Sequence, residues 1–329
     1  MILYTPPAVA RPIPLIDLGD SFAADLDRRR AVAWEVHKAC RDTGFFYIKN
    51  HGIPDAMLAR QIEWARQFFA LPEAAKLALT MDTAKGPVGY EPIGRQTLDL
   101  GSPPDLKEGF QFHRERDAQS LGQASEGAYR GANRWPDGIP GFRQQMLDYQ
   151  ARIVGLGRHL MHVVALSLDL DEDFFAVNPD ELMCSVRLLH YPPQPKDAAV
   201  NQLGAGAHTD WGCITMLLQD DCGGLEVQHA SGEWIRATPM SGTLIVNLGD
   251  MVRRWTNDLY HSTMHRVCNA ASGRDRYSVA SFFSPGYSYR VECVPTCRPE
   301  HGAPLYPPCT VGEHTKEMFE RTYGRQRAI

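Results

Sequence analysis

Residues 206–212 read GAHTDWG, and residues 262–267 read STMHRV with one further histidine, His265. On a β-strand, residues two apart point to the same face, so His208 and Asp210 would project together. Residues 213–262 form a segment long enough to cross a barrel and return, which would bring His265 beside them. Two histidines and one carboxylate suit Fe(II) and leave three coordination positions open. The stretch therefore predicts strands gathered around an iron site.

The second half of the chain reads as a series of short strands. Alternating or apolar runs are separated by turn signals and cover residues 183–191, 213–218, 224–228, 233–237, 243–247 and 276–283. Many short strands at this spacing are typical of a sandwich or a barrel.

The first half is predicted to be mainly helical. Apolar residues recur at helical intervals over 22–42, 55–69 and 140–169, and the last of these is the longest helix candidate, suited to bracing a sheet. Residues 80–135 are rich in Gly, Pro and Asp and predict long loops with room for short strands. A final helix is expected over 310–323, where Phe319 and Tyr323 could close the mouth of the barrel.

A second pair of polar residues suits a carboxylate. Arg276 and Ser278 share one face of the strand predicted at 276–283. A guanidinium presents a planar fork that matches a carboxylate, and the neighbouring hydroxyl adds another donor. We expect these two side chains to bind an acid near the metal.

Ordered motifs along nearly the whole chain resemble one family, the isopenicillin N synthase-like branch of the iron- and 2-oxoglutarate-dependent oxygenases. The motifs are PIPLIDL at 12–18, GFFYIKNHGI at 44–53, DLKE at 105–108, NRWP at 133–136, HYPP at 190–193, GLEV at 224–227, WI at 234–235 and VNLGD at 246–250. They fall in the family's order between and around the candidate ligands.

The resemblance implies a fold and a division of the chain. The fold would be α+β with a mainly β core, a double-stranded β-helix (jelly roll, cupin-like) flanked by N-terminal helices, one long bracing helix and a C-terminal helix. We expect an N-terminal non-haem dioxygenase region at 10–135, the bracing helix at 136–180, the jelly-roll core at 181–290 and a C-terminal extension at 291–329.

The resemblance also assigns roles to residues. It makes His208, Asp210 and His265 the ligands of Fe(II), with Arg276 and Ser278 binding the distal carboxylate of 2-oxoglutarate and Tyr191 adding a hydroxyl. His261 and His51 are expected to stay outside the site, the first as a surface or supporting residue and the second in a turn.

The implied reaction couples oxidative decarboxylation of 2-oxoglutarate, to succinate and CO2, with hydroxylation, desaturation or cyclisation of a small organic substrate. O2 is consumed, and ascorbate is a candidate reductant. Three alternatives stay open: an oxidase of the same fold that uses no 2-oxoglutarate, such as isopenicillin N synthase or aminocyclopropane carboxylate oxidase; an enzyme that decomposes 2-oxoglutarate to ethylene; and a noncatalytic jelly-roll binding protein.

Arg187 departs from the commonest family pattern. It lies four residues before Tyr191 and would share its inward face on a strand. A charge on an inward face is costly unless it is paired. Two interpretations remain open, a structural ion pair with an internal carboxylate and a contact with a carboxylate of the substrate or of 2-oxoglutarate.

The substrate pocket is predicted from aromatic residues. Trp211 should face away from the iron if strand alternation holds, and the candidate pocket residues beside Arg187 are Tyr90, Phe110, Phe112 and Phe283. These side chains suit a small organic molecule better than a protein surface.

Composition restricts the partners. The 329 residues carry a net charge of −5 without a basic run, which argues against nucleic-acid binding. The first residues, MILYTPP, show no pattern of a signal peptide or membrane span. Eight scattered cysteines lack zinc-site spacing, and free thiols together with Fe(II) favour a reducing cytoplasm. We expect a monomer or a homodimer.

Overall fold

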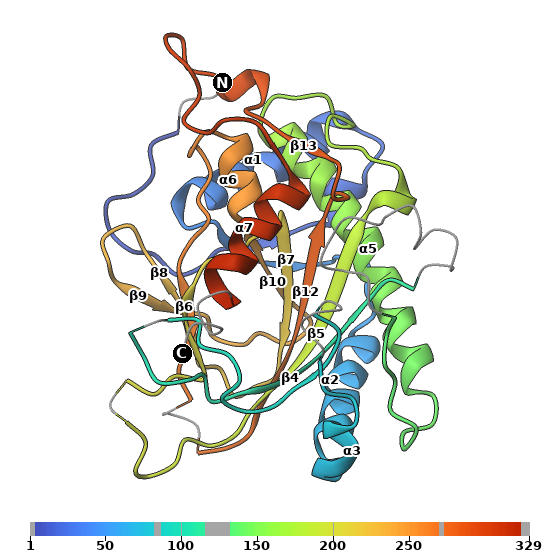
Figure 1. Ribbon diagram of the computed structural model, residues 1–329. Coiled ribbons are helices and arrows are strands. Elements are labelled where there is room, and N and C mark those ends of the chain that lie inside the picture. The colour runs from blue at the N-terminus through green and yellow to red at the C-terminus, as the bar shows by residue number, and fades with distance from the viewer. Residues whose placement is uncertain are drawn as a thin grey trace.

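A computed structural model describes residues 4–81, 87–99, 101–115, 132–199, 201–269 and 273–323. Its centre is a sheet of eight strands in the order β1-β2-β10-β7-β12-β5-β4-β3 (Figure 1). These strands are β1 (Leu15–Asp17), β2 (Phe45–Lys49), β3 (Gly89–Glu91), β4 (Glu108–His113), β5 (Met183–Tyr191), β7 (Ile214–Gln219), β10 (Leu244–Leu248) and β12 (Arg276–Ser284).

A smaller sheet of four strands has the order β6-β11-β8-β9. It consists of β6 (Ala205–His208), β8 (Leu225–Gln228), β9 (Trp234–Arg236) and β11 (His265–Val267). The chain passes repeatedly between the two sheets, since β7 and β10 of the large sheet alternate in sequence with strands of the small one. This is the jelly roll that the sequence predicted. A separate pair, β13 (Arg290–Val291) and β14 (Cys309–Thr310), lies near the C-terminus.

The two faces of the large sheet bury different cores because side chains alternate along each strand. On β2, Phe46 and Ile48 join the core beneath the helices, whereas Phe45 and Tyr47 join a second core shared with the small sheet. The same alternation runs along the other central strands. The second core therefore lies between the sheets, where the predicted metal ligands are found.

Helices cover the outer face of the large sheet. α1 (Leu26–Asp42) begins at Asp25, whose carboxylate accepts a hydrogen bond of 2.8 Å from the backbone N–H of Asp27 and so caps the helix. α2 (Asp55–Phe69) and α3 (Glu73–Leu77) follow, and α5 (Phe142–Ser167) runs along the sheet beside β5 and β12 (Figure 1). The expected bracing helix is thus present at 142–167.

In the described part of the chain, the other helical elements are α6 (Asp250–Trp255), α7 (Val311–Tyr323) and three short 3-10 turns at Gly19–Phe22, Pro179–Glu181 and Pro295–Cys297. The side chains of Phe319 and Tyr323, predicted to close the barrel mouth, lie outside the described part. None of the described helices is long and apolar enough to cross a membrane.

The stretch at 80–135, predicted as long loops with room for short strands, contains the strands β3 and β4. β3 and β4 extend the large sheet beyond β5, and β4 pairs with β5 from Glu108 opposite His190 to His113 opposite Ser185. Every residue of β4 except His113 is buried. The run EGFQFH lacks β-branched residues and follows many turn signals, and pairing with β3 on one side and β5 on the other sets the bounds of the strand.

Candidate active site

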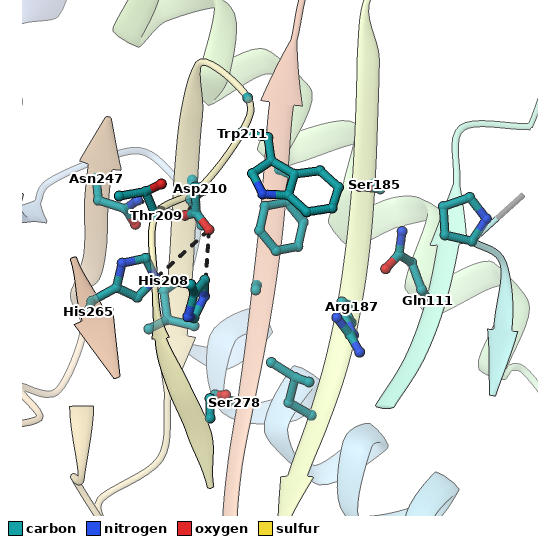
Figure 2. A pocket seen from close by; sticks show the side chains of 18 of the residues that line it. Gln111, Ser185, Arg187, His208, Thr209, Asp210, Trp211, Asn247, His265 and Ser278 are labelled. Carbon is teal, nitrogen blue, oxygen red and sulfur yellow. Dashed lines mark hydrogen bonds and ion pairs between the residues drawn. The ribbon is translucent and has the colours of Figure 1, made fainter. Parts of the chain in front are cut away.

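His208, Asp210 and His265 come together between the two sheets, as their spacing predicted (Figure 2). His208 on β6 lies directly opposite His265 on the antiparallel strand β11, and their ring centroids are 4.3 Å apart. The Nε2 atoms of His208 and His265 lie 4.0 Å and 3.8 Å from Oδ1 of Asp210. Three ligand atoms at these separations can share one metal ion.

Hydrogen bonds to the backbone orient both imidazoles. Nδ1 of His208 is 2.7 Å from the carbonyl oxygen of Gly206, and Nδ1 of His265 is 3.1 Å from that of Thr263. Each Nδ1–H therefore donates outward, which leaves the unprotonated Nε2 facing the shared site. Burial, followed by repulsion from His265, lowers the pKa of His208 to about 3, so this ring is neutral at neutral pH.

Asp210 does not lie on the same strand as His208, which corrects the predicted geometry. β6 ends at His208, and residues 209–213 cross from the small sheet to the large one. There, Oδ2 of Asp210 accepts hydrogen bonds of 2.5 Å from Thr215 Oγ1 and 2.7 Å from Asn247 Nδ2. Thr215 and Asn247 are themselves an opposed pair on β7 and β10. The large sheet therefore fixes the carboxylate, with Oδ1 directed at the histidines.

The charge state of Asp210 also suits a cation. Burial alone would raise the pKa of its carboxyl group, but the neighbouring His265 and His208 and the two hydrogen bonds outweigh this effect, and the pKa ends below its usual value. The carboxylate is thus ionised at neutral pH. Two imidazoles beside a carboxylate match the donor set of a facial Fe(II) site.

A close backbone contact holds the crossing segment in place. The N–H of Asp250, at the start of α6, donates to the carbonyl oxygen of Asp210 over 2.8 Å. A Cβ atom at Gly249 would overlap the carbonyl oxygen of Gly212 and lie 2.9 Å from that of Asp210. Only glycine fits at 249, which explains one residue of the VNLGD motif.

Arg276, Ser278 and Tyr191 form a second polar group in the same cavity. Arg276 lies opposite Tyr191 in the pairing of β12 with β5, and its guanidinium is 4.7 Å from the centre of the Tyr191 ring. Nη1 of Arg276 donates to Ser278 Oγ over 3.1 Å, and Nε donates to the carbonyl oxygen of Gly223 over 2.6 Å. The arginine side chain is thereby held in one orientation.

The guanidinium of Arg276 lacks a carboxylate partner among the described residues, although Arg276 is only 3% exposed. A buried charge without a counter-ion is costly. An anionic ligand that enters the cavity would remove this cost and could accept hydrogen bonds from Arg276 and Ser278 together. The structure thus places Arg276 and Ser278 side by side on the cavity wall, while their role in binding an acid stays a prediction.

The three candidate metal ligands and Arg276 line one cavity of about 270 Å³ between the sheets. Its far wall is polar and comes from neighbouring strands: Gln111 on β4 is opposite Arg187 on β5, and His113 is opposite Ser185. Figure 2 shows Gln111, Arg187 and Ser185 across the cavity from the histidines, with Trp211 over the space between.

The predicted aromatic pocket residues are wrong in four positions. Tyr90, Phe110, Phe112 and Phe283 belong to the core beneath the helices and do not line the cavity. Strand alternation is the reason, since Gln111 and Phe282 are the neighbours that face inward. A Cβ atom at Gly157 of α5 would lie 2.5 Å from the Phe283 ring, which places that ring against the helix.

Trp211 was also predicted wrongly, because it lines the cavity instead of facing away from the metal site. The prediction assumed that the strand continued past His208, whereas β6 ends there. His51 and His261 stay outside the cavity as predicted. Nδ1 of His51 accepts a hydrogen bond of 3.2 Å from the N–H of Ile53, so it stabilises its turn.

For Arg187 the structure shows the first interpretation left open by the sequence, an ion pair with an internal carboxylate. It forms an ion pair with Glu91, whose side chain is 5% exposed, and it also lines the cavity. The internal carboxylate was predicted in kind, but Glu91 itself was not. The position of Glu91 depends on the pairing of β3 with β4, which the sequence did not indicate.

Comparisons with known proteins identify the family. Residues 13–138 match the description "non-haem dioxygenase in morphine synthesis N-terminal", and residues 182–285 match "2OG-Fe(II) oxygenase superfamily". The 2-oxoglutarate-Fe(II) type oxidoreductase hxnY of Emericella nidulans is 37% identical, over 96% of this chain and 91% of that protein. The chain belongs to the isopenicillin N synthase-like family of Fe(II)/2-oxoglutarate oxygenases.

Two more proteins support the assignment. Homoarginine-6-hydroxylase 2-ODD-C23 of Glycine max is 34% identical, over 92% of this chain and 94% of that protein. The crystal structure of a full-length Neurospora crassa protein in complex with alpha-KG and thymine superposes with a TM-score of 0.83 at 29% identity, covering 94% of this chain and 96% of that one. The chain is therefore an Fe(II)- and 2-oxoglutarate-dependent dioxygenase, and the main functional prediction is confirmed.

Proposed function

We propose that His208, Asp210 and His265 hold the Fe(II) of this dioxygenase, and that Arg276, Ser278 and Tyr191 bind the distal carboxylate of 2-oxoglutarate. The main support is Arg276, a buried guanidinium without a carboxylate partner among the described residues, in the same cavity as the three ligand atoms. Its hydrogen bonds to Gly223 and Ser278 keep it oriented before any ligand arrives.

When both are bound, Fe(II) and 2-oxoglutarate activate O2, which oxidises 2-oxoglutarate to succinate and CO2 and oxidises a substrate C–H bond. The residues of the chain prepare this chemistry. Burial is the main reason that the pKa of Tyr191 is raised, so its hydroxyl keeps its proton and can donate to the carboxylate. Thr215 and Asn247 hold Asp210 so that one carboxylate oxygen remains for the metal.

The substrate proposed here is a small organic molecule held in the same cavity. The volume of about 270 Å³ and the mixture of aromatic and polar wall residues support this class. The thymine complex of the Neurospora crassa protein shows that a relative takes a small ring compound. Eight free cysteines and an Fe(II) site favour a reducing compartment, which supports the cytoplasm as its location.

Anaerobic absorption spectroscopy tests the assignment of the site. Fe(II) and 2-oxoglutarate added to the wild type should give a charge-transfer band, and adding O2 with a metabolite library should give succinate. His265→Ala should lose Fe(II) binding measured by calorimetry. Arg276→Leu should keep Fe(II) but require at least about tenfold more 2-oxoglutarate to form the band, since a charge-assisted bidentate contact is lost.

Arg276→Lys is the matched control, because it keeps the charge and loses the planar fork. Its affinity for 2-oxoglutarate should fall between those of the wild type and Arg276→Leu. Full iron affinity in His265→Ala, or unchanged 2-oxoglutarate affinity in Arg276→Leu, would contradict the assignment.

A further inference from the structure

The cavity wall that faces the metal site carries two cations whose charges are balanced by buried carboxylates. They are Lys107, which directly precedes β4, and Arg187 on β5. Lys107 is ion-paired with Asp105, and Arg187 is ion-paired with Glu91. The exposed fractions of the Asp105 and Glu91 side chains are 2% and 5%, so both carboxylates depend on these partners.

Arg114 and Arg276 also line the cavity, and each has defined hydrogen-bond partners. Arg114 donates from Nη1 to the carbonyl oxygens of Pro179 and Leu182, over 2.5 Å and 3.0 Å. Arg276 is the group proposed to bind 2-oxoglutarate. With the proposed cofactors bound, the charges of Fe(II), Asp210, 2-oxoglutarate and Arg276 cancel. The carbonyl contacts of Arg114 hold its side chain without cancelling its charge, so the balance of charge applies to the metal site and to the part of the wall formed by Lys107 and Arg187.

A carboxylate that approached Arg187 would meet Glu91 as well. It would either place a second negative charge beside the buried Glu91 carboxylate or take away its partner, and both are unfavourable in a low-dielectric interior. A neutral acceptor such as a carbonyl oxygen has no such conflict, because it could share the guanidinium without displacing Glu91. Gln111, directly opposite Arg187, offers an amide donor and acceptor to the same ligand.

The apolar part of the cavity lies between this polar wall and the metal site. Phe282 on β12 is opposite Ser185 on β5 and also opposite Thr215 on β7, the hydrogen-bond partner of Asp210. Trp211 lines the same space and, like Phe282, is only partly buried although it points into the interior. Two strand spacings, about 10 Å, separate β7 from β5. A ring packed on Phe282 would therefore lie between the metal site, beside β7, and Arg187 on β5.

Resting on the proposed function, we propose that this dioxygenase oxidises an uncharged, flat molecule whose carbonyl or amide group is bound by Arg187 and Gln111 and whose ring packs on Trp211 and Phe282. The Glu91–Arg187 ion pair would determine specificity, since it keeps an arginine as a hydrogen-bond donor while cancelling the charge that would attract acids. This places the oxidised carbon at the opposite end of the molecule from its carbonyl or amide group.

Paired probes test the proposal. The protein, loaded anaerobically with Fe(II) and 2-oxoglutarate, is titrated with aromatic and heteroaromatic carboxamides and with the corresponding carboxylic acids. Binding is followed by perturbation of the charge-transfer band, and substrate-dependent succinate formation is then measured with O2. The wild type should prefer the carboxamide by about tenfold or more, a discrimination that buried like charges readily produce.

Two variants make the ion pair itself the tested feature. Glu91→Gln takes the carboxylate away from Arg187 and should lower the carboxamide preference by about tenfold or reverse it. The double variant Glu91→Gln, Arg187→Gln removes both charges and should restore the preference for the carboxamide. A general loss of packing at this position would not produce such a restoration.

A preference of the wild type for acids, an unchanged preference in Glu91→Gln, or no binding of the carboxamides would overturn the proposal. The charge-transfer band separates this failure from failure of the proposed function. If the band forms in the wild type and both variants, the cofactor site is intact and only the substrate class is at fault. If the wild type gives no band, the cofactor assignment itself fails.

Discussion

Asp210 uses its two carboxylate oxygens for different purposes. Oδ2 accepts hydrogen bonds from Thr215 and Asn247 on the large sheet, while Oδ1 faces the histidines of the small sheet. The residue therefore joins the two sheets at the metal site. Partners of this kind control how well a ligand is aimed, so the large sheet should influence metal affinity without supplying a ligand.

Removing one of these donors should weaken iron binding. We expect Thr215→Val and Asn247→Ala each to reduce Fe(II) affinity by about 10- to 100-fold, because Asp210 loses one of two orienting hydrogen bonds. Anaerobic calorimetry measures the change. Thr243→Val is the control, since its hydroxyl donates to the carbonyl oxygen of Met240 on an exposed turn. Unchanged Fe(II) affinity in both variants would show that these hydrogen bonds to the Asp210 carboxylate do not affect metal binding.

At the level of elements, β12 separates the roles of adjacent residues. Ser278, Ala280 and Phe282 face the cavity between the sheets, whereas Val279 and Phe283 face the helices. Phe283 is 1% exposed and packs on α5, while Phe282 is partly buried. Two consecutive phenylalanines thus lie in two different environments.

Replacing these two phenylalanines should affect different measurements. Phe283→Ala should reduce the unfolding free energy by about 3–5 kcal/mol through loss of buried surface and formation of a cavity. Phe282→Ala should cost less stability and instead weaken substrate binding. Urea denaturation and the succinate assay separate the two effects. Equal loss of stability in both variants would contradict the assigned faces.

The long helix α5 offers a similar matched pair. A Cβ atom at Gly157 would lie 2.5 Å from the Phe283 ring, whereas a Cβ at Gly155 would meet nothing within 4 Å. Gly157→Ala should therefore destabilise the protein by about 1–3 kcal/mol through overpacking. Gly155→Ala should stabilise it by about 0.5–1 kcal/mol, because alanine favours the helix. Thermal unfolding would show opposite shifts, and shifts of the same sign would contradict the packing of α5 on β12.

At the scale of the whole molecule, burial controls several histidines away from the metal site. Burial is the first cause that lowers the pKa values of His37, His51, His159, His261 and His314. For His159 the pKa falls to about 4. A lowered pKa means that the folded protein binds fewer protons than the unfolded chain between the two values.

This proton difference predicts acid sensitivity. The unfolding free energy of the metal-free protein should be fully present above about pH 6.5 and should decrease as the pH falls from there towards 4. The carboxylates of Glu108 and Asp258, whose pKa values are lowered, act in the same direction at lower pH. Urea titrations between pH 4 and 8 measure the slope. His159→Gln should make the slope shallower, and a slope steeper than that of the wild type would contradict the assigned shift.

Local pattern explains which parts of the fold were predictable. The central strands and the long helices carry clear periodicity, and their observed bounds fall within one or two residues of most predicted ones. β4 was anticipated only as room for short strands within a loop region, because the Gly- and Pro-rich residues before it show little periodicity and pairing with β5 sets its bounds. Because β4 and β3 were not located, Gln111 on β4 and Glu91 on β3, the partner of Arg187, were also missed.

Some errors in the site were avoidable from the sequence. Arg276 and Ser278 were expected to face inward on β12, and Phe282 has the same parity, whereas Phe283 does not. The parity of Tyr191 and Arg187 on β5 likewise indicates Ser185. Trp211 could not be placed this way, because no local signal marks the end of β6 at His208.

The sequence by itself determined the family, the candidate metal ligands and the pair proposed to bind an acid, because these depend on residue type and on short spacings that chemistry constrains. Only the tertiary structure decided which aromatic rings line the cavity, how Asp210 is supported, and that Arg187 is neutralised by Glu91. These features depend on which strands become neighbours and on where a strand ends. Pairing between distant segments sets both, and local sequence carries little trace of it.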